Sequence, residues 1–362
     1  MSTSSYDSYR PPEPDRRRKG KRRRRAGGPR GGDGSREMPV VPDAEFGSYY
    51  GRPVVKAPPW ETDVAAYLFL GGLAGGSALL AAGAELTGQD QLRRSSRFAA
   101  IGAAGLGAVA LVRDLGRPER FLNMLRTLKL TSPMSVGSWI LAGFSGCAGL
   151  AAADEVDRTT GGRLPLGRLR PLLRGAGTAG GLGAGLLAPP LAAYTAVLLS
   201  DTAVPTWNEA REELPFVFVG SASLAAGGLA MITTSSAQAG PARVLAVVGV
   251  ASELAASEVM ERRMDETVAE TLHQGRAGTM LQVSKALAAA GGLGTLLAGR
   301  WRAAGVISGV ALLASSALTR LGFFEAGLRS AEDPKYTVEP QKRRLAERRA
   351  AGTTDDSITT GP

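Results

Sequence analysis

Between Val64 and Phe324 the chain alternates long apolar blocks with shorter polar connections. A helix that crosses a membrane needs about 20 mostly apolar residues. Eight such blocks can be placed, at 64–86, 97–113, 135–153, 172–199, 214–234, 242–260, 280–299 and 303–324. A soluble core would rarely isolate such long uncharged runs. The pattern therefore predicts an all-α integral membrane bundle of eight transmembrane helices over residues 60–330.

Both ends of the chain are polar and basic. Residues 1–59 include the arginine-rich run Arg16–Arg25, and residues 331–362 form a charged C-terminal tail. Such compositions cannot bury a core, so both tails are predicted to be disordered. No apolar segment follows the arginine run closely enough for a secretory signal. Nucleic-acid binding is the other reading of an arginine run, but beside eight spans we expect attraction to anionic membrane lipids and no nucleic-acid partner.

Eight spans return the chain to the side on which it began. The lysines and arginines of the internal loops are nearly balanced between the two sides, so the basic tails decide the orientation. They place both termini in the cytoplasm, with the protein in the bacterial cell membrane. The Trp60 end of the first span then faces the cytoplasm too.

The passage from Arg113 to Trp139 is the longest polar stretch that separates two apolar blocks and still has an ordered pattern. Within Asp114–Pro133, apolar residues follow helical spacing at Phe121, Leu122, Leu125 and Leu128. The spacing predicts a short helix in the membrane interface. A solvated loop with fortuitous spacing is the alternative reading of this stretch.

The usual metal ligands are almost missing. Cys147 is the single cysteine and His273 the single histidine. An intramolecular disulfide, a self-contained iron–sulfur cluster and a bis-histidine haem are therefore excluded within one chain. His273 lies in a polar loop and is expected to be an ordinary surface histidine.

Several residues inside the spans carry further expectations. Gly71 with Gly75, and Gly72 with Gly76, form small-xxx-small pairs that predict close helix packing. Pro189-Pro190 should kink or interrupt the fourth span. Tyr194 follows one turn later, which makes it a candidate site residue, with plain packing as the alternative. Glu85 is expected to reach the surface.

The sixth span contains two carboxylates, Glu253 and Glu258. Ionisable groups inside a membrane are costly and are functional hypotheses by default. We therefore predict that Glu253 and Glu258 belong to a proton path. Glu253 lies deeper in the span, whereas Glu258 is near its end, where simple solvation is the alternative.

Five segments, taken together and in order, resemble the NrfD/polysulfide reductase membrane-subunit family. The segments read YLFLGGLAGG from Tyr67, DLGRPERFLNML from Asp114, TSPMSVGSW from Thr131, YTAVLLS from Tyr194 and AGLRSAEDPKYTV from Ala326, and the resemblance as a whole extends over residues 60–345. The resemblance implies an eight-helix membrane protein that binds a quinone, menaquinone or ubiquinone. It also implies an iron–sulfur partner with ferredoxin-like modules and a molybdopterin catalytic subunit.

This implication suits a redox subunit without ligands for haem or clusters, which can exchange electrons only through a diffusible carrier and a partner's cofactor. The positions that match the family's quinone-binding places hold Glu61, Asp63, Tyr67 and Tyr194. The family pattern includes a histidine near the first helix, and this chain has none there. Acidic residues would have to exchange the protons instead.

The Asp114 stretch shares its side of the membrane with Trp60, so it is predicted to dock the iron–sulfur subunit. The residues expected to order or carry this docking surface are Asp114, Arg117, Arg120 and Arg126. Two other readings stay open. A transporter or ion pump without redox chemistry would also explain Glu253 and Glu258, and a structural anchor would have lost quinone reactivity.

Overall fold

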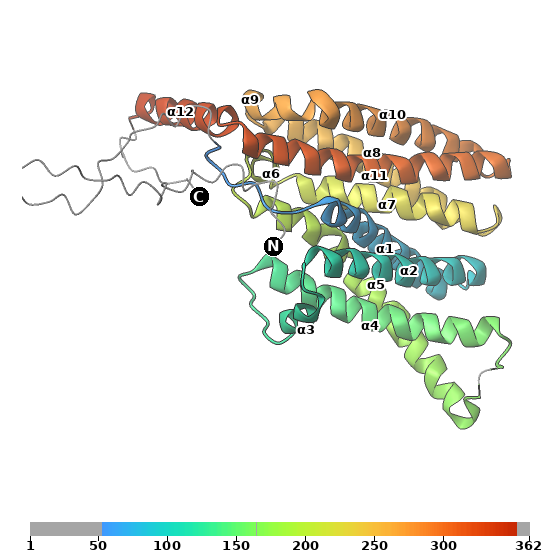
Figure 1. Cartoon of the computed structure of the whole chain (residues 1–362). Coiled ribbons are helices and arrows are strands. Elements are labelled where there is room, and N and C mark those ends of the chain that lie inside the picture. Colours follow the sequence, from blue (N-terminus) through green and yellow to red (C-terminus); the bar gives the residue numbers. More distant parts are fainter. Residues whose placement is uncertain (1–52, 164, 353–362) are drawn as a thin grey trace, which may run out of the picture. The chain divides into compact units, whose positions relative to one another are not determined.

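A computed structural model describes residues 53–163 and 165–352, and every regular element in these ranges is a helix (Figure 1). Residues 1–52 and 353–362, which hold most of the predicted N-terminal tail and the end of the C-terminal tail, lie outside the described residues. Eight long helices occupy the described ranges: α1 Thr62–Leu86, α2 Asp90–Asp114, α4 Pro133–Thr159, α5 Arg170–Ser200, α7 Leu214–Thr233, α8 Gly240–Arg263, α10 Gly275–Leu297 and α11 Arg302–Glu332.

Seven of these helices, all except α8, are long and apolar enough to cross a membrane. The predicted all-α membrane protein is thus confirmed. Consecutive long helices pack side by side as four hairpins, α1 with α2, α4 with α5, α7 with α8 and α10 with α11. In Figure 1, α8 lies among α7, α10 and α11 and runs alongside these three helices, which meet the length and hydropathy criterion for a membrane span.

Helix α1 is the centre of the bundle, in contact with α2, α5 and α7. Its glycines allow this. A Cβ on Gly75 would lie 2.8 Å from the Ala188 carbonyl oxygen of α5, and one on Gly76 would lie 2.6 Å from the Ala222 carbonyl oxygen of α7. Both distances are too short for a side chain, so the predicted close packing is confirmed at these two positions.

Five short helices gather at the end of the bundle where α1 begins, at the left in Figure 1, whereas η3 Gly167–Leu169 lies in the connection between α4 and α5. The five are η2 Pro118–Arg120, α3 Phe121–Met124, α6 Pro205–Glu209, α9 Glu266–Ala269 and η4 Glu270–Leu272. Trp60 stacks on Trp207 of α6 with 5.8 Å between ring centroids. The Trp207 indole N–H donates to the Phe323 carbonyl oxygen at 2.8 Å, which ties α6 to α11. We call this the Trp60 end, and the opposite one the Glu85 end.

The Asp114 stretch is only partly helical. Phe121 and Leu122 lie in α3, as predicted, whereas Leu125 and Leu128 follow it in an irregular segment that runs to α4. Ser132 caps α4 by accepting a hydrogen bond from the Ser135 backbone N–H. Pro133 occupies the first turn of α4, where a backbone donor is not needed.

The C-terminal segment differs from the prediction. Disorder was expected, but Lys335–Ala350 form helix α12. Arg343 pairs with Asp265 at 3.1 Å and Arg344 with Glu209 at 2.7 Å. In sequence these basic residues are typical of a solvated tail, but in the fold they form salt bridges with carboxylates of the connections between the long helices.

Helix α5 also differs from one reading of the sequence. Pro189 and Pro190 lie inside a single helix, so the predicted interruption does not occur. Each proline removes only its own backbone donor. Because lipid offers the remaining backbone groups no other partner, the rest of the helical hydrogen bonds are kept.

An ionic cluster closes the Glu85 end between α1, α2, α4 and α5. Glu85, which was expected to reach the surface, instead pairs with Arg97 at 3.0 Å. Arg97 also contacts Asp154 at 3.1 Å and Glu155 at 3.2 Å, and all three side chains are buried. Asp154 further pairs with Arg174 at 3.0 Å. Opposite charges within the cluster compensate one another, which makes their burial tolerable.

Candidate functional site

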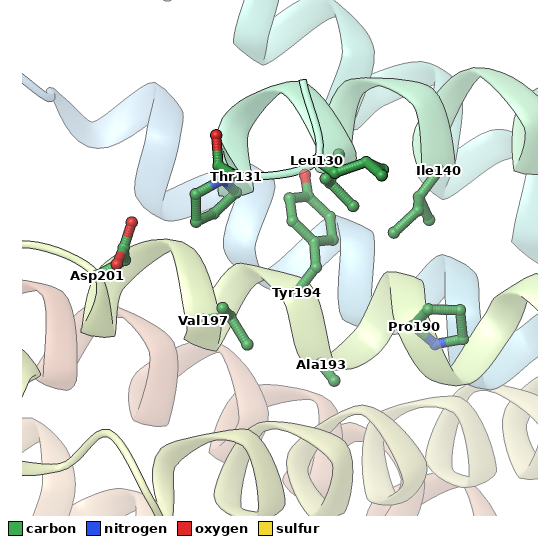
Figure 2. A pocket seen from close by; sticks show the side chains of 10 residues that line it. Leu130, Thr131, Ile140, Pro190, Ala193, Tyr194, Val197 and Asp201 are labelled. Atoms are coloured by element: carbon green, nitrogen blue, oxygen red, sulfur yellow. The ribbon is translucent and has the colours of Figure 1, made fainter. Parts of the chain in front are cut away.

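A pocket of ≈ 410 Å³ opens between α4 and α5 near the Trp60 end. Its walls come from the end of the Asp114 stretch, the first turns of α4 and the last turns of α5 (Figure 2). The lining residues are Leu130, Thr131, Pro133, Val136, Ile140, Pro190, Ala193, Tyr194, Val197 and Asp201. The volume falls within the ~300–1,000 Å³ typical of small-molecule sites.

Helix α5 supplies one side of the pocket through a single face. Pro190, Ala193, Tyr194, Val197 and Asp201 follow spacings of three and four residues, which place them on one helical stripe. Figure 2 shows the Tyr194 side chain rising from α5 toward the segment that precedes α4. The pocket is therefore mostly apolar, with the polar groups of a tyrosine, a threonine and an aspartate.

Gly137 of α4 makes room for the tyrosine. A Cβ at this position would lie 2.2 Å from Cε2 and 2.5 Å from Cδ2 of the Tyr194 ring. No real side chain tolerates such contacts. The ring position that shapes the pocket thus depends on a glycine in the facing helix.

Tyr67 lies behind Tyr194 and not in the pocket. The two rings have centroids 6.2 Å apart. Tyr67 is buried, and among the described residues its hydroxyl has no hydrogen-bond partner. The pair therefore joins α1 to α5 and leaves one phenolic hydroxyl unpaired beside the pocket wall.

The acidic candidates gather on the neighbouring rim. Glu61 is exposed at the start of α1, and Asp63 forms a 3.7 Å pair with Arg113. Asp114, the last residue of α2, accepts a hydrogen bond from the Glu61 backbone. The structure thus brings these carboxylates together at the Trp60 end, but none of them lines the pocket.

The predicted docking stretch is strongly exposed. Arg117, Arg120 and Arg126 point to solvent, and none of them forms a salt bridge with a described residue. Apolar side chains are exposed beside them, with Leu122 at 69% and Leu130 at 79%. Leu130 belongs both to this stretch and to the pocket wall, so the exposed surface and the pocket are contiguous.

Glu253 lies elsewhere, buried between α7, α8 and α11. Its Oε1 accepts a hydrogen bond from the Thr319 hydroxyl at 2.5 Å, and Thr319 contacts Ser284 at 2.6 Å. Among the described residues its Oε2 has no partner. Glu258 differs, because it is exposed and pairs with Arg262 at 2.8 Å. Its position gives the predicted proton-path role no support.

Arg320 is a buried charge that sequence reasoning did not single out. Its guanidinium donates to the Leu68 carbonyl oxygen at 3.1 Å and lies 3.8 Å over the Phe218 ring. The sequence signal was present, because Arg320 lies inside the predicted apolar span 303–324. Asp201 was also missed, although its position seven residues after Tyr194 puts both on one helical face.

Together, the long apolar helices, the buried charges and the lateral pocket at one end of the bundle define a polytopic helical membrane protein. The family described as Polysulphide reductase, NrfD matches residues 54–282, more than half of the chain, and the protein belongs to this family. A search of curated proteins finds no match to the chain. Membership makes the chain a membrane subunit of an oxidoreductase complex that partners catalytic subunits.

Proposed function

We propose that this chain is the quinone-reactive membrane subunit of a respiratory oxidoreductase complex, and that the pocket between α4 and α5 holds the head of a menaquinone or ubiquinone. One observation carries the proposal. An apolar pocket with a tyrosine hydroxyl is continuous, through Leu130, with an exposed surface suited to a partner.

The residues present fit a quinone. The Tyr194 hydroxyl can donate a hydrogen bond to a quinone oxygen, and the apolar side chains of Val136, Ile140 and Val197 suit contact with a quinone ring. A bound quinone supplies reversible two-electron, two-proton chemistry. Asp201 lines the same pocket and is exposed, so its carboxylate can exchange protons with solvent.

Tyr67 and the rim carboxylates have supporting parts in this proposal. The Tyr67 ring backs the Tyr194 ring and would hold its position. Glu61 and Asp63 lie at the same end of the bundle, where they would supply protons to the region around the pocket. We expect their removal to cost less activity than removal of the Tyr194 hydroxyl.

The exposed surface of the Asp114 stretch is proposed to dock an iron–sulfur subunit of the ferredoxin type, which would in turn carry electrons to or from a molybdopterin catalytic subunit. Electron transfer requires the partner's cluster to lie near the quinone. A docking surface that shares Leu130 with the pocket meets this requirement. Asp114 orders the surface through its contact with Glu61.

A proton path through Glu253 is also proposed. The linked hydroxyls of Thr319, Ser284 and Ser315 connect Glu253 to α10 and α11 inside the bundle. The same observation favours the alternative of an ion pump without redox chemistry. Activity that depends on Glu253 but not on quinone would favour that alternative.

We propose further that α8 crosses the membrane with the other seven long helices. It is 24 residues long and packs against α7 and α10. Its lower hydropathy reflects charged residues such as the buried Glu253. Eight crossings leave the start of α1 and the end of α11 on one side, which we propose is the cytoplasm of a bacterial cell.

The test replaces Tyr194 by phenylalanine in the intact complex. Loss of one hydrogen bond to the quinone should lower quinone-linked turnover about three- to tenfold and leave turnover with an artificial acceptor unchanged. Tyr336→Phe, on α12 and outside the pocket, is the matched control. Full quinone-linked turnover in Tyr194→Phe would move the site elsewhere.

A further inference from the structure

A second groove, of ≈ 600 Å³, opens between the beginning of α7 and the last three turns of α8. Its walls include Phe216, Ala255 and Val259, and its polar mouth is formed by Glu212, Glu213 and Arg263. Phe216 is 65% exposed and Val259 44% exposed, so the groove faces outward. It shares no lining residue with the pocket between α4 and α5.

The groove has the depth of one leaflet of a bilayer. It extends along α8 from Arg263 to Ser252, eleven residues deeper. At about 1.5 Å per residue this is about 16 Å, close to half of a hydrocarbon core of about 30 Å. Small residues, Ser252 and Ala255 among them, leave space for a chain to lie against the helix. The polar mouth lies at the Trp60 end, where lipid headgroups would be.

The mouth of the groove holds three charged side chains whose hydrogen-bonding groups are only partly used within the protein. Arg263 Nη1 lies 2.7 Å from Glu213 and 3.5 Å from Glu212. The other N–H groups of this guanidinium have no hydrogen-bond partner among the described residues, which leaves donors for a phosphate. Glu212 is 67% exposed and only weakly engaged, so it can accept from an ammonium group. One cation and two carboxylates suit a headgroup that carries both a phosphate and an ammonium.

We propose that this groove is a binding site for a phospholipid with a primary ammonium headgroup, of the phosphatidylethanolamine type. The phosphate contacts Arg263, the ammonium contacts Glu212, and one acyl chain lies along Ala255 and Phe216. A net negative mouth disfavours phosphatidylglycerol, whose headgroup has no cation. Phosphatidylcholine lacks the N–H donors that a carboxylate accepts from. The proposal rests on the proposed crossing of the membrane by α8 and is independent of the quinone site.

The experiment measures lipid retention by native mass spectrometry on the full chain, purified in detergent and supplied with each of the three lipids in turn. Wild type should retain one molecule of phosphatidylethanolamine more than Ala255→Phe, which fills the groove. Val244→Phe, on the exposed face of α8 outside the groove, should retain it as wild type does. Glu212→Gln should weaken retention of phosphatidylethanolamine about tenfold, because a charge-assisted contact is lost.

Equal retention of all three lipids by wild type would overturn the proposal, as would unchanged retention in Ala255→Phe. Glu212→Gln changes only an exposed side chain, so it decides the question even where Ala255→Phe does not fold. A quinone retained in this groove in place of phospholipid would also overturn it.

Discussion

Gly137 offers the sharpest way to disturb the pocket without touching a group that would contact quinone. In Gly137→Ala the new Cβ would lie 2.2 Å from Tyr194 Cε2. Carbon atoms pack at about 3.5 Å or more, so the ring must retreat by about 1.3 Å. Misplacement of about 1 Å can cost about 100-fold in rate. We therefore expect quinone-linked turnover to fall about 10- to 100-fold, with overpacking costing about 1–3 kcal/mol in stability.

The control is Gly143→Ala on the same helix, α4. Its Cβ would lie 3.5 Å from Leu187 Cδ1, an ordinary contact. Replacing glycine by alanine favours the helix by about 1 kcal/mol at either position, so this contribution to stability cancels when the two variants are compared. The assay compares turnover with quinone and with an artificial acceptor in the intact complex. The reasoning is refuted if Gly137→Ala keeps full quinone-linked turnover, or if Gly143→Ala loses as much.

Three further results are expected. Arg97→Met should destabilise the protein by about 3–5 kcal/mol, because it leaves the buried Asp154 with one cation fewer; an unchanged thermal unfolding midpoint in detergent would argue against this. Arg126→Glu should release the proposed iron–sulfur partner on native gels while membrane insertion persists, and an intact complex would rule out this surface. The hydrogen bond from Lys335 lowers the pKa of Glu270 below its ordinary 4.5. The Lys335–Glu270 pair therefore stabilises α12 fully above pH 4.5, and this stabilisation is lost as the pH falls through the lowered pKa of Glu270. Protease cleavage of α12 should increase over that pH range. Cleavage that does not change at acid pH would contradict this prediction.

Hydropathy predicted the long helices well, because a membrane-spanning helix depends on local composition. It predicted the ends less well. Helix α2 begins at Asp90, seven residues before the apolar block, because Arg93 and Arg97 are held inside the bundle by carboxylates of α4. Such partners lie about 60 residues away in the chain and leave no local pattern.

The site was predictable only in part. Tyr194 was found from the neighbouring prolines and from the family resemblance, and the structure places it in a pocket. The role of Gly137 as the space for its ring depends on how α4 faces α5, which sequence spacing does not reveal. Helix α12 was missed for a similar reason, since Arg343 and Arg344 are exposed-tail residues in composition and anchored residues in the fold.

Photolabelling tests the proposed quinone site most directly. A quinone carrying a photoreactive azide on its ring is irradiated with the intact complex, and the labelled peptides are sequenced. Label is expected within residues 130–140 and 190–201, suppressed by excess unmodified quinone and reduced in Gly137→Ala. Competable label confined to other helices would contradict it.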